Sequence, residues 1–265
     1  MSGRGRTALV TGASAGIGAA FARLLAAEGF DLVLVARRRS RLETLAKELE
    51  RAHGVTAHVV AADLADSAAP REIHATLQSR SIPVDVLVNN AGYGLREGFA
   101  AARWQQHAEF IQVMATSLTE LCHLFAASMR ERGWGRILNV SSVAAFSPAV
   151  AGSLYGGIKA YGVGFSQALG LELEGTGVNV CALCPGYTLS EFHDVIDVRD
   201  QIDALPHFLV MTAETVARQG WQAVQRGDPI CIPGWIYRLI CCVCRLAPPS
   251  MLRVISRRSV LRPKR

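Results

Sequence analysis

Three polar residues near the middle of the chain have the types and the spacing needed to transfer a proton. Tyr155 and Lys159 are four positions apart in a stretch of helical character, so their side chains share one helix face. Ser142 precedes this pair at the end of an expected strand. Because the pKa of a tyrosine hydroxyl is near 10, lowering it to about 7 requires roughly 4 kcal/mol in favour of the phenolate. A lysine ammonium beside the ring supplies part of this, so Tyr155 is a candidate general acid and base.

A glycine-rich turn near the N-terminus supplies a second signal. The sequence TGASAGIG at 11–18 lies between an expected strand and an expected helix. Glycines there allow a tight turn and a close approach of a pyrophosphate to the backbone, and the first turn of the helix offers N–H groups to the phosphates. The turn therefore predicts a dinucleotide site. A Tyr-x-x-x-Lys pair alone is common and is usually a surface contact, so the interpretation depends on both patterns together.

The end of the second expected strand indicates which dinucleotide binds. Sites for NAD usually carry an acidic residue there, which binds the ribose 2′-hydroxyl. This chain has Arg37 instead, followed by Arg38 and Arg39. A guanidinium group suits a 2′-phosphate, so Arg37 predicts NADP(H) as the cofactor. The alternative is that the three arginines only begin a solvated helix.

These residues are expected to lie on an alternation of short strands and helices. Helical patterns cover 17–28 and a charged segment from Ser40, with Glu43 in a capping-box position, to about His53. Strand-like runs fall at 7–11, 31–36, 55–61, 84–89, 136–141 and 178–184. Such alternation predicts the α/β class, with a single Rossmann-type, doubly wound parallel sheet and helices on both faces. No linker or repeat divides the chain, so one domain over 1–265 is expected.

Composition excludes several other classes of protein. The chain has 265 residues, of which 50% are hydrophobic and 19% charged, which is too apolar for disorder and long enough for a full core. No apolar run reaches the roughly 18 residues of a membrane span, and the N-terminus lacks the pattern of a signal peptide. Seven cysteines, an odd number, argue against a secreted disulfide framework. We therefore expect a cytoplasmic protein with reduced thiols.

Positive charge is concentrated at the C-terminal end of the chain. After Asp228 there is no acidic residue. The basic residues there are Arg238, Arg245, Arg253, Arg257, Arg258, Arg262, Lys264 and Arg265. Such an extension, at about 234–265, suits nucleic acid or an anionic membrane, but it shows no nucleic-acid-binding motif. We favour a solvated end, with no nucleic-acid partner and with membrane contact as the less favoured alternative.

Five motifs together resemble one known family. They are TGASAGIG (11–18), VNNAG (88–92), NVSS (139–142), YGGIK (155–159) and CPGYT (184–188). Their order and spacing are similar to those of the short-chain dehydrogenase/reductase family, over about residues 7 to 190. The resemblance implies a sheet of about seven parallel strands, reversible hydride transfer between a nicotinamide and a carbonyl or alcohol, and dimers or tetramers formed through helices near 104–131 and 154–175.

The resemblance also implies roles for individual residues. Tyr155 would be the general acid and base, Ser142 would orient the carbonyl, and Lys159 would bind the ribose and lower the pKa of the tyrosine. The implied cofactor contacts are Gly12, Ser14, Gly16, Ile17, Gly18, Arg37, Asp63, Leu64, Asn90, Tyr155, Lys159, Pro185, Gly186 and Thr188. The expected substrate contacts are Ser142, Phe146, Tyr155, Tyr187 and Phe192, within an apolar pocket for a hydrophobic carbonyl or alcohol that Leu154, Phe208 and Met211 also suggest.

One position departs from the family pattern. The family commonly has an asparagine 28 residues before the catalytic serine, where it holds a water that relays protons from the lysine. This chain has Met114 there, and a thioether cannot donate a hydrogen bond. Thr116 or Ser117 is a candidate substitute. The alternative to an active reductase is therefore a catalytically weak, NADPH-binding regulatory or scaffold protein.

The cysteines and histidines do not predict a metal site. Cys181 and Cys184 lie on an expected strand, so buried core thiols are expected rather than a metal or redox pair. Cys241, Cys242 and Cys244 lie in the apolar segment 235–246. That segment has three candidate roles: it covers the pocket, it pairs subunits, or it lies on a membrane.

Overall fold

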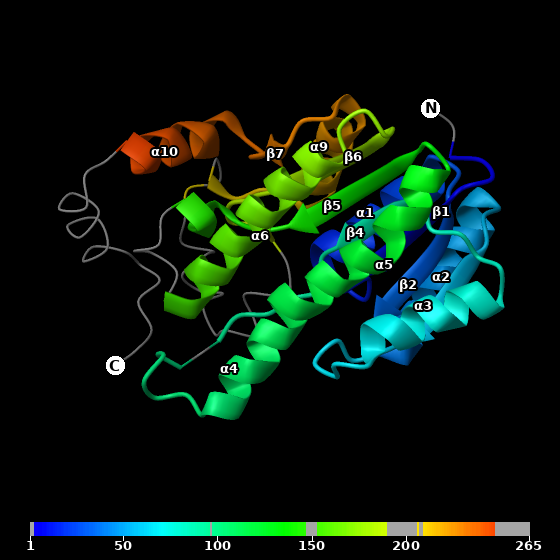
Figure 1. Ribbon diagram of the computed structural model, residues 1–265, viewed down its shortest axis with the longest axis horizontal. Coiled ribbons are helices and arrows are strands. Elements are labelled where there is room, and N and C mark those ends of the chain that lie inside the picture. The colour runs from blue at the N-terminus through cyan, green and yellow to red at the C-terminus, as the bar shows by residue number, and fades with distance from the viewer. Residues whose placement is uncertain (1–2, 96, 147–152, 190–205, 207–208, 247–265) are drawn as a thin grey trace.

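The sheet of this protein is fully parallel and has seven strands (Figure 1). The computed structural model describes residues 3–95, 97–146, 153–189, 206 and 209–246. The strands are β1 (Thr7–Thr11), β2 (Asp31–Ala36), β3 (Ala57–Ala61), β4 (Val86–Asn89), β5 (Gly135–Val140), β6 (Val178–Leu183) and β7 (Ile230–Cys231). Their order is β3-β2-β1-β4-β5-β6-β7. The predicted Rossmann-type α/β fold is thereby confirmed.

Helices cover both faces of the sheet. They are α1 (Gly16–Ala27), α2 (Arg39–His53), α3 (Ala69–Ser79), α4 (Trp104–Ile111), the π-helical turn η1 (Gln112–Thr116), α5 (Ser117–Glu131), the 3-10 turn η2 (Val143–Phe146), α6 (Ser153–Glu172), α9 (Ala213–Arg226) and α10 (Trp235–Leu246). Helices α1, α2 and α9 share one core cluster, and α3, α5 and α6 share the other.

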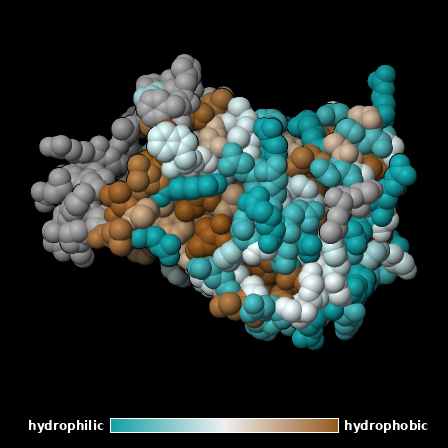
Figure 2. Space-filling view, turned by 90° about the horizontal axis from the view of Figure 1, so that it is seen from above, coloured by the Kyte–Doolittle hydropathy of each residue, from teal (hydrophilic) through white to brown (hydrophobic). Residues whose placement is uncertain are grey.

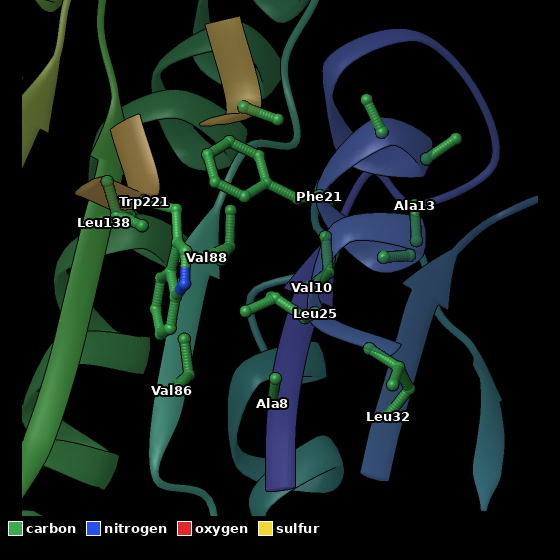
Figure 3. Packing of buried hydrophobic residues seen from close by; sticks show 14 of the residues in the cluster. Ala8, Val10, Ala13, Phe21, Leu25, Leu32, Val86, Val88, Leu138 and Trp221 are labelled. Atoms are coloured by element: carbon green, nitrogen blue, oxygen red, sulfur yellow. The ribbon is translucent and has the colours of Figure 1, made fainter. Parts of the chain in front are cut away.

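Alternate residues of the central strands point into these two clusters. On β1, Val10 packs with α1 and α9, whereas Leu9 packs on the opposite side. Figure 3 shows Phe21 of α1 and Trp221 of α9 packed over β1 and β4. Apolar side chains on both sides explain why the strands read as continuous hydrophobic runs rather than alternating ones.

The sheet order reverses direction between β1 and β4. In open parallel sheets, ligands bind at the carboxyl ends of the strands beside such a switch point. The glycine turn follows β1, Asn90 follows β4, Ser142 follows β5 and the 184–188 motif follows β6. All the motifs of the expected site therefore lie along one edge of the sheet.

Several boundaries differ from the sequence expectation. Helix α2 begins at Arg39 with Arg38 as its N-cap, so the prediction that Ser40 caps this helix was wrong. Glu43 lies 3.8 Å from the Arg39 guanidinium instead of completing a capping box. Strand β7 has only two residues, too few for a sequence pattern to reveal. It pairs in parallel with β6 and forms the last strand of the sheet at that edge.

One helical run among the described residues is long and apolar enough to cross a membrane by length and composition. It is Trp104–Glu131, formed by α4, η1 and α5. Its residues Leu121, Phe125 and Met129 are buried in the core cluster beneath the sheet. It is therefore a core helix of this fold.

Candidate active site

The glycine turn after β1 needs glycine at two positions for different reasons. The backbone of Gly12 has φ of +65°, a conformation that disfavours side chains. At Gly18, a Cβ atom would lie 2.3 Å from the carbonyl oxygen of Gly12. Glycine at position 18 thus lets the first turn of α1 approach the turn that precedes it. The result is a tight, half-buried backbone turn at the N-terminal end of a helix.

Asn90 fixes this turn from the neighbouring strand. Its Nδ2 donates to the carbonyl oxygens of Thr11 (3.0 Å) and Gly12 (3.3 Å). The Thr11 hydroxyl accepts in return from the backbone N–H of Asn90 (2.9 Å) and of Ala91 (3.0 Å). The ends of β1 and β4 are therefore cross-linked at the switch point, and the side-chain amide of Asn90 stabilises the glycine turn.

Of the three arginines after β2, Arg38 contacts the glycine turn. Its Nε and Nη2 lie 3.2 Å and 2.9 Å from the Ser14 hydroxyl. Arg37, which the sequence favoured, is well exposed, with Nη1 3.8 Å from the Asp63 carboxylate. The guanidinium group at the glycine turn is thus that of Arg38, whereas sequence reasoning singled out Arg37. The side chain of Leu64, beside Asp63, is buried in the core.

Ser142, Tyr155 and Lys159 come together although two elements carry them. The Ser142 hydroxyl lies close enough to the Tyr155 hydroxyl to act on its pKa, in the lowering direction. The Lys159 Nζ lies 5.7 Å from the centroid of the Tyr155 ring and donates to the carbonyl oxygen of Val140 (2.9 Å). The predicted grouping of the three side chains is therefore present in the structure.

Two further hydrogen bonds hold α6 against β5. The Ser141 hydroxyl donates to the carbonyl oxygen of Lys159 (2.7 Å). Deeper in the molecule, the buried Asn139 Nδ2 donates to the Ser166 hydroxyl (2.9 Å). Both bonds are long-range in sequence, so they fix the register of α6 and with it the position of Tyr155 relative to Ser142.

Burial dominates the acid–base properties of the pair. It raises the pKa of Tyr155 to about 12, although the hydrogen bond with Ser142 acts in the opposite direction. It lowers the pKa of Lys159 to about 8. The protein alone therefore does not make Tyr155 acidic, and the tyrosine is a protonated phenol at neutral pH. The lysine ammonium was expected to supply part of the lowering, and burial of the hydroxyl outweighs it here.

The depressed pKa of Lys159 predicts a pH-dependent stability. Between about pH 8 and 10.5, the unfolded chain keeps a proton on this amine that the folded chain lacks, so stability rises with pH. Relative to Lys159→Met, the wild-type protein should gain on the order of 2 kcal/mol in unfolding free energy between about pH 7 and pH 9.5. Urea unfolding of both proteins at several pH values measures this, and a pH-independent difference would contradict it.

A tyrosine far along the chain secures the turn after β6. The Tyr237 hydroxyl of α10 accepts from the N–H of Tyr187 (3.0 Å) and donates to the carbonyl oxygen of Leu209. Its ring lies against Gly186, where a Cβ atom would come within 2.0 Å of a ring carbon. Sequence reasoning did not identify Tyr237. The only signal was a tyrosine within an apolar segment, which does not reveal its partner.

Removing the Tyr237 hydroxyl should loosen this turn. In Tyr237→Phe, the Tyr187 N–H loses its acceptor, which costs about 1–3 kcal/mol for a buried group. We expect the melting temperature to fall by roughly 3 to 8 °C. Tyr161→Phe, whose hydroxyl lies on an exposed side chain, is the matched control. Equal melting temperatures for the wild type and Tyr237→Phe would show that the hydroxyl does not stabilise the turn.

Comparison with known proteins identifies the family. A model of the family described as short chain dehydrogenase matches residues 6–200. The chain belongs to the short-chain dehydrogenase family. It is 38% identical to serine 3-dehydrogenase of Agrobacterium fabrum over 190 residues, 70% of this chain and 73% of that one. It is 34% identical to the ketoacyl reductase HetN of a Nostoc species over 195 residues, 74% and 67% of the two chains.

A solved structure shows the same architecture. The short-chain dehydrogenase from Sphingobium yanoikuyae, in complex with NADPH, superposes with a TM-score of 0.81 and 33% sequence identity, over 89% of this chain and 91% of that one. Because the relatives of this short-chain dehydrogenase are named reductases and dehydrogenases, its class is oxidoreductase. Their names differ in substrate, so the family does not indicate which substrate this chain uses.

Met114, where this short-chain dehydrogenase departs from the family pattern, lies in the π-helical turn η1. Its side chain is buried and packs on Gly92, whose Cβ atom would lie 3.3 Å from the Met114 Cε. The Ser117 hydroxyl donates to the carbonyl oxygen of Leu64 (2.8 Å) and accepts from Gln112 (3.1 Å). The Ser117 hydroxyl is therefore buried and makes two hydrogen bonds within the protein. Thr116 is exposed.

The remaining site predictions divide between described and undescribed residues. Phe146 lies on η2 next to Ser142, with the Arg245 guanidinium 5.3 Å from its ring centroid. Phe192 and Phe208 lie outside the described residues. Cys181 and Cys184 are buried free thiols, as expected. Within the described part of the chain, no group of three His, Cys, Asp or Glu side chains is placed to hold a metal ion.

Proposed function

We propose that this short-chain dehydrogenase is an NADP(H)-dependent oxidoreductase that interconverts a carbonyl and an alcohol by hydride transfer, using Ser142, Tyr155 and Lys159. One observation carries the proposal. The side chains of Ser142 and Lys159 both lie beside Tyr155, Ser142 close enough to act on the pKa of its hydroxyl and the Lys159 Nζ 5.7 Å from its ring centroid, at the sheet edge where the glycine turn lies. Position at this edge distinguishes the arrangement from a surface Tyr-x-x-x-Lys contact.

The residues at the switch point fit a dinucleotide phosphate. At Gly12 and Gly18 a Cβ atom would collide with Asn90, and at Gly18 also with the Gly12 carbonyl, so glycine permits the tight turn that leads directly into the N-terminus of α1, where backbone N–H groups suit a phosphate. We assign Arg37 and Arg38 to a ribose 2′-phosphate, and Asp63 with Leu64 to the adenine. When bound, the cofactor supplies or accepts the hydride. The chain would hold it with Gly12, Ser14, Gly16, Ile17, Gly18, Arg37, Arg38, Asp63, Leu64, Asn90, Tyr155, Lys159, Pro185, Gly186 and Thr188.

Each catalytic side chain has a separate task in this proposal. The Tyr155 hydroxyl donates its proton to the carbonyl oxygen during reduction and takes a proton back during oxidation. Ser142 orients the same oxygen through its hydroxyl. Lys159 binds the ribose hydroxyls and, while protonated, favours the phenolate. A protonated Tyr155 at neutral pH is the state that reduction requires, since the hydroxyl is the proton donor in that direction.

The proposed substrate is a small to medium hydrophobic ketone, aldehyde or alcohol. Phe146 lies on η2, which begins directly after Ser142, and Tyr187 lies on the turn after β6, which accepts a hydrogen bond from Val143 of η2 through the Pro185 carbonyl. Helix α10 packs against η2. Phe192 is proposed to complete the pocket. Apolar and aromatic walls with few polar groups favour a substrate recognised mainly by its apolar surface.

Oxidation of NADPH in the presence of hydrophobic ketones and aldehydes tests the proposal. We expect turnover with NADPH, weaker turnover with NADH, and none with small polar carbonyls. Tight NADPH binding without turnover across a broad panel would favour the second candidate, a catalytically weak NADPH-binding regulatory or scaffold protein. Met114 is the observation behind that second candidate.

Met114→Asn addresses the second candidate directly. An asparagine side chain at this position would face the NNAG backbone that Met114 now covers, and it can both donate and accept hydrogen bonds. If proton relay limits the reaction, kcat should rise by roughly two- to tenfold. Met114→Leu, which keeps an apolar side chain, should leave kcat nearly unchanged. A folded Met114→Asn protein with equal or lower kcat would count against the relay explanation.

We also propose a cytoplasmic homodimer or homotetramer that pairs through the long helices around 104–131 and 154–175. Tyr161 and Leu171 of α6 are exposed apolar side chains on this surface, 44% and 73% accessible in the single chain. Light scattering gives the mass of the assembly. A monomer at micromolar concentration would contradict this arrangement.

A further inference from the structure

Helix α10 has two opposite apolar faces, and within the described part of the chain only one of them is buried. Tyr237, Cys241 and Cys244 are buried against the rest of the chain. On the other side, the accessible fractions of the large apolar residues are 72% for Trp235, 57% for Leu239, 45% for Val243 and 80% for Leu246. Figure 2 shows hydrophobic side chains gathered at the end of the molecule where α10 lies in Figure 1.

The exposed residues form one continuous stripe. Positions 235, 239, 243 and 246 recur every three or four residues, so they lie along a single side of the helix. With 12 residues, α10 is about 18 Å long, well short of the roughly 20 residues that span a bilayer. A helix of this length with an outward apolar stripe suits the plane of a membrane surface rather than its interior.

Arginines border the stripe and line a cavity beside it. Arg238 and Arg245 are seven positions apart on one edge of α10. With Arg226 at the end of α9 they line a cavity of about 390 Å³. The other lining residues are Ala223, Asp228, Ile230, Cys231 and Ile232.

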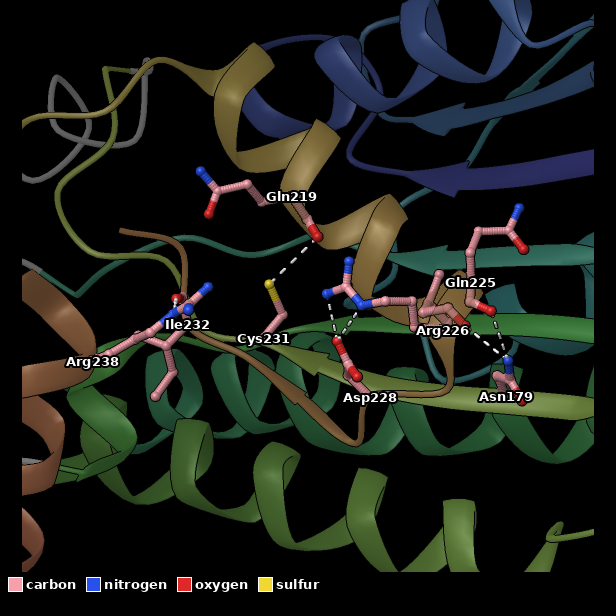
Figure 4. A network of polar contacts seen from close by, with 9 residues as sticks. Asn179, Gln219, Gln225, Arg226, Asp228, Cys231, Ile232 and Arg238 are labelled. Atoms are coloured by element: carbon pink, nitrogen blue, oxygen red, sulfur yellow. Dashed lines mark hydrogen bonds and ion pairs between the residues drawn. The ribbon is translucent and has the colours of Figure 1, made fainter. Parts of the chain in front are cut away.

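The known contacts of these arginines leave donors for an anion. Asp228 pairs with Arg226, and the Nε of Arg238 donates to the carbonyl oxygen of Ile232 at 3.0 Å (Figure 4). Arg245 stacks near the ring of Phe146. Because a guanidinium has five N–H donors, Arg238 and Arg245 keep several for phosphate oxygens.

Charge decides which partner suits this surface. From residue 229 to 265 the sequence carries eight basic residues and no acidic one. A second copy of the same face would bring like charges together, whereas an anionic lipid surface is complementary to it. The apolar stripe and its basic border are thus matched to acyl chains and phosphate headgroups respectively.

We propose that α10 lies flat on an anionic membrane surface. Trp235, Leu239, Val243 and Leu246 insert between the lipids, and Arg226, Arg238 and Arg245 surround a lipid phosphate in the adjoining cavity. Cys241 and Tyr237 keep the opposite side of the helix attached to the protein. The site lies outside the segment that matches the family, which ends at residue 200. It does not depend on the proposed activity, since lipid binding requires no turnover.

Flotation of the full-length protein with vesicles tests the proposal. We expect the protein to float with vesicles of phosphatidylcholine and phosphatidylserine, to stay at the bottom with phosphatidylcholine alone, and to lose binding as salt is raised. Failure to float with the mixed vesicles would overturn the proposal. Equal binding to both vesicle types would overturn the assignment of the arginines to a headgroup.

Two pairs of matched variants separate the stripe from the basic border. Leu239→Glu should weaken vesicle binding at least tenfold, whereas Phe99→Glu, at a site of nearly equal accessibility (58% against 57%), should not. Arg238→Gln with Arg245→Gln should weaken binding roughly tenfold. The same charge change in Arg51→Gln with Arg80→Gln, on distant exposed arginines, should have a much smaller effect. Equal losses in test and control would show that binding follows net charge alone.

The subunit-pairing alternative has its own readout. Light scattering without vesicles should give the same mass for the wild type and Leu239→Glu. A lower mass for Leu239→Glu, together with a wild-type protein that does not float, would assign this face to a subunit interface and overturn the lipid proposal. All substituted positions are exposed, so circular dichroism should report unchanged folding for each variant.

Discussion

Replacing Tyr155 with phenylalanine should reduce turnover by roughly a thousandfold while leaving NADPH binding nearly unchanged. The substitution removes the hydroxyl that is proposed to transfer the proton, and positioned acid–base groups contribute about 10² to 10⁴ in rate. The ring that packs near Phe110, with centroids 6.4 Å apart, is retained. Single-turnover kinetics and NADPH fluorescence titration measure the two quantities separately.

Tyr161→Phe is the control for this prediction because Tyr161 lies on the same helix. Its hydroxyl is 2.7 Å from that of Thr119, at the surface. Turnover of Tyr161→Phe should equal that of the wild type. If Tyr155→Phe kept more than about a tenth of the wild-type rate, Tyr155 would not be the proton donor, because that loss is smaller than acid–base catalysis provides.

Removing Arg37 and Arg38 together should reverse the preference between the two nicotinamide cofactors. In the double variant Arg37→Gln with Arg38→Gln, the affinity for NADPH should fall by about ten- to hundredfold. Hydrogen bonds to charged groups contribute about 1.5–3 kcal/mol, and the 2′-phosphate would lose both guanidinium partners. The affinity for NADH, which has no 2′-phosphate, should stay within a few fold. Binding titrations with both cofactors measure the effect.

Arg39→Gln is the matched control, since Arg39 adjoins the same pair but points toward Glu43 on the surface of α2. It should not change the NADPH to NADH ratio. Equal losses of NADPH and NADH affinity in the double variant would indicate damage to the turn rather than loss of phosphate recognition. The single variants then rank Arg37, near Asp63, against Arg38, bonded to Ser14.

Much of the fold could be predicted because its signals are local. The buried strands are short, continuous apolar runs, and the glycine turn occupies the strand–turn–helix context that dinucleotide binding requires. β7 could not be found, since two residues carry no periodicity. The cap of α2 was misplaced by two residues. Serine is a favoured N-cap, but the backbone geometry after β2 places Arg38 there instead.

The candidate site was predictable in its composition and less so in its contacts. Ser142, Tyr155 and Lys159 follow from spacing and were found together. The bond between Arg38 and Ser14 joins residues from two loops, and no pattern within either loop indicates it. The contact between the Tyr237 ring and Gly186 joins two positions that are far apart in the sequence, with no fixed spacing that a pattern could detect. Such pairs arise only when the chain packs.

The sequence alone determined the class of fold, the order of the strands along the chain, the dinucleotide turn and the three residues proposed for catalysis. Each of these depends on residue types at short, fixed separations, where backbone geometry leaves few alternatives. Only the tertiary structure decided that burial raises the pKa of Tyr155 and lowers that of Lys159, that Ser117 is already bonded to Leu64, and that α10 turns one apolar face outward. These properties depend on which distant surfaces exclude water from one another, and that is settled by packing.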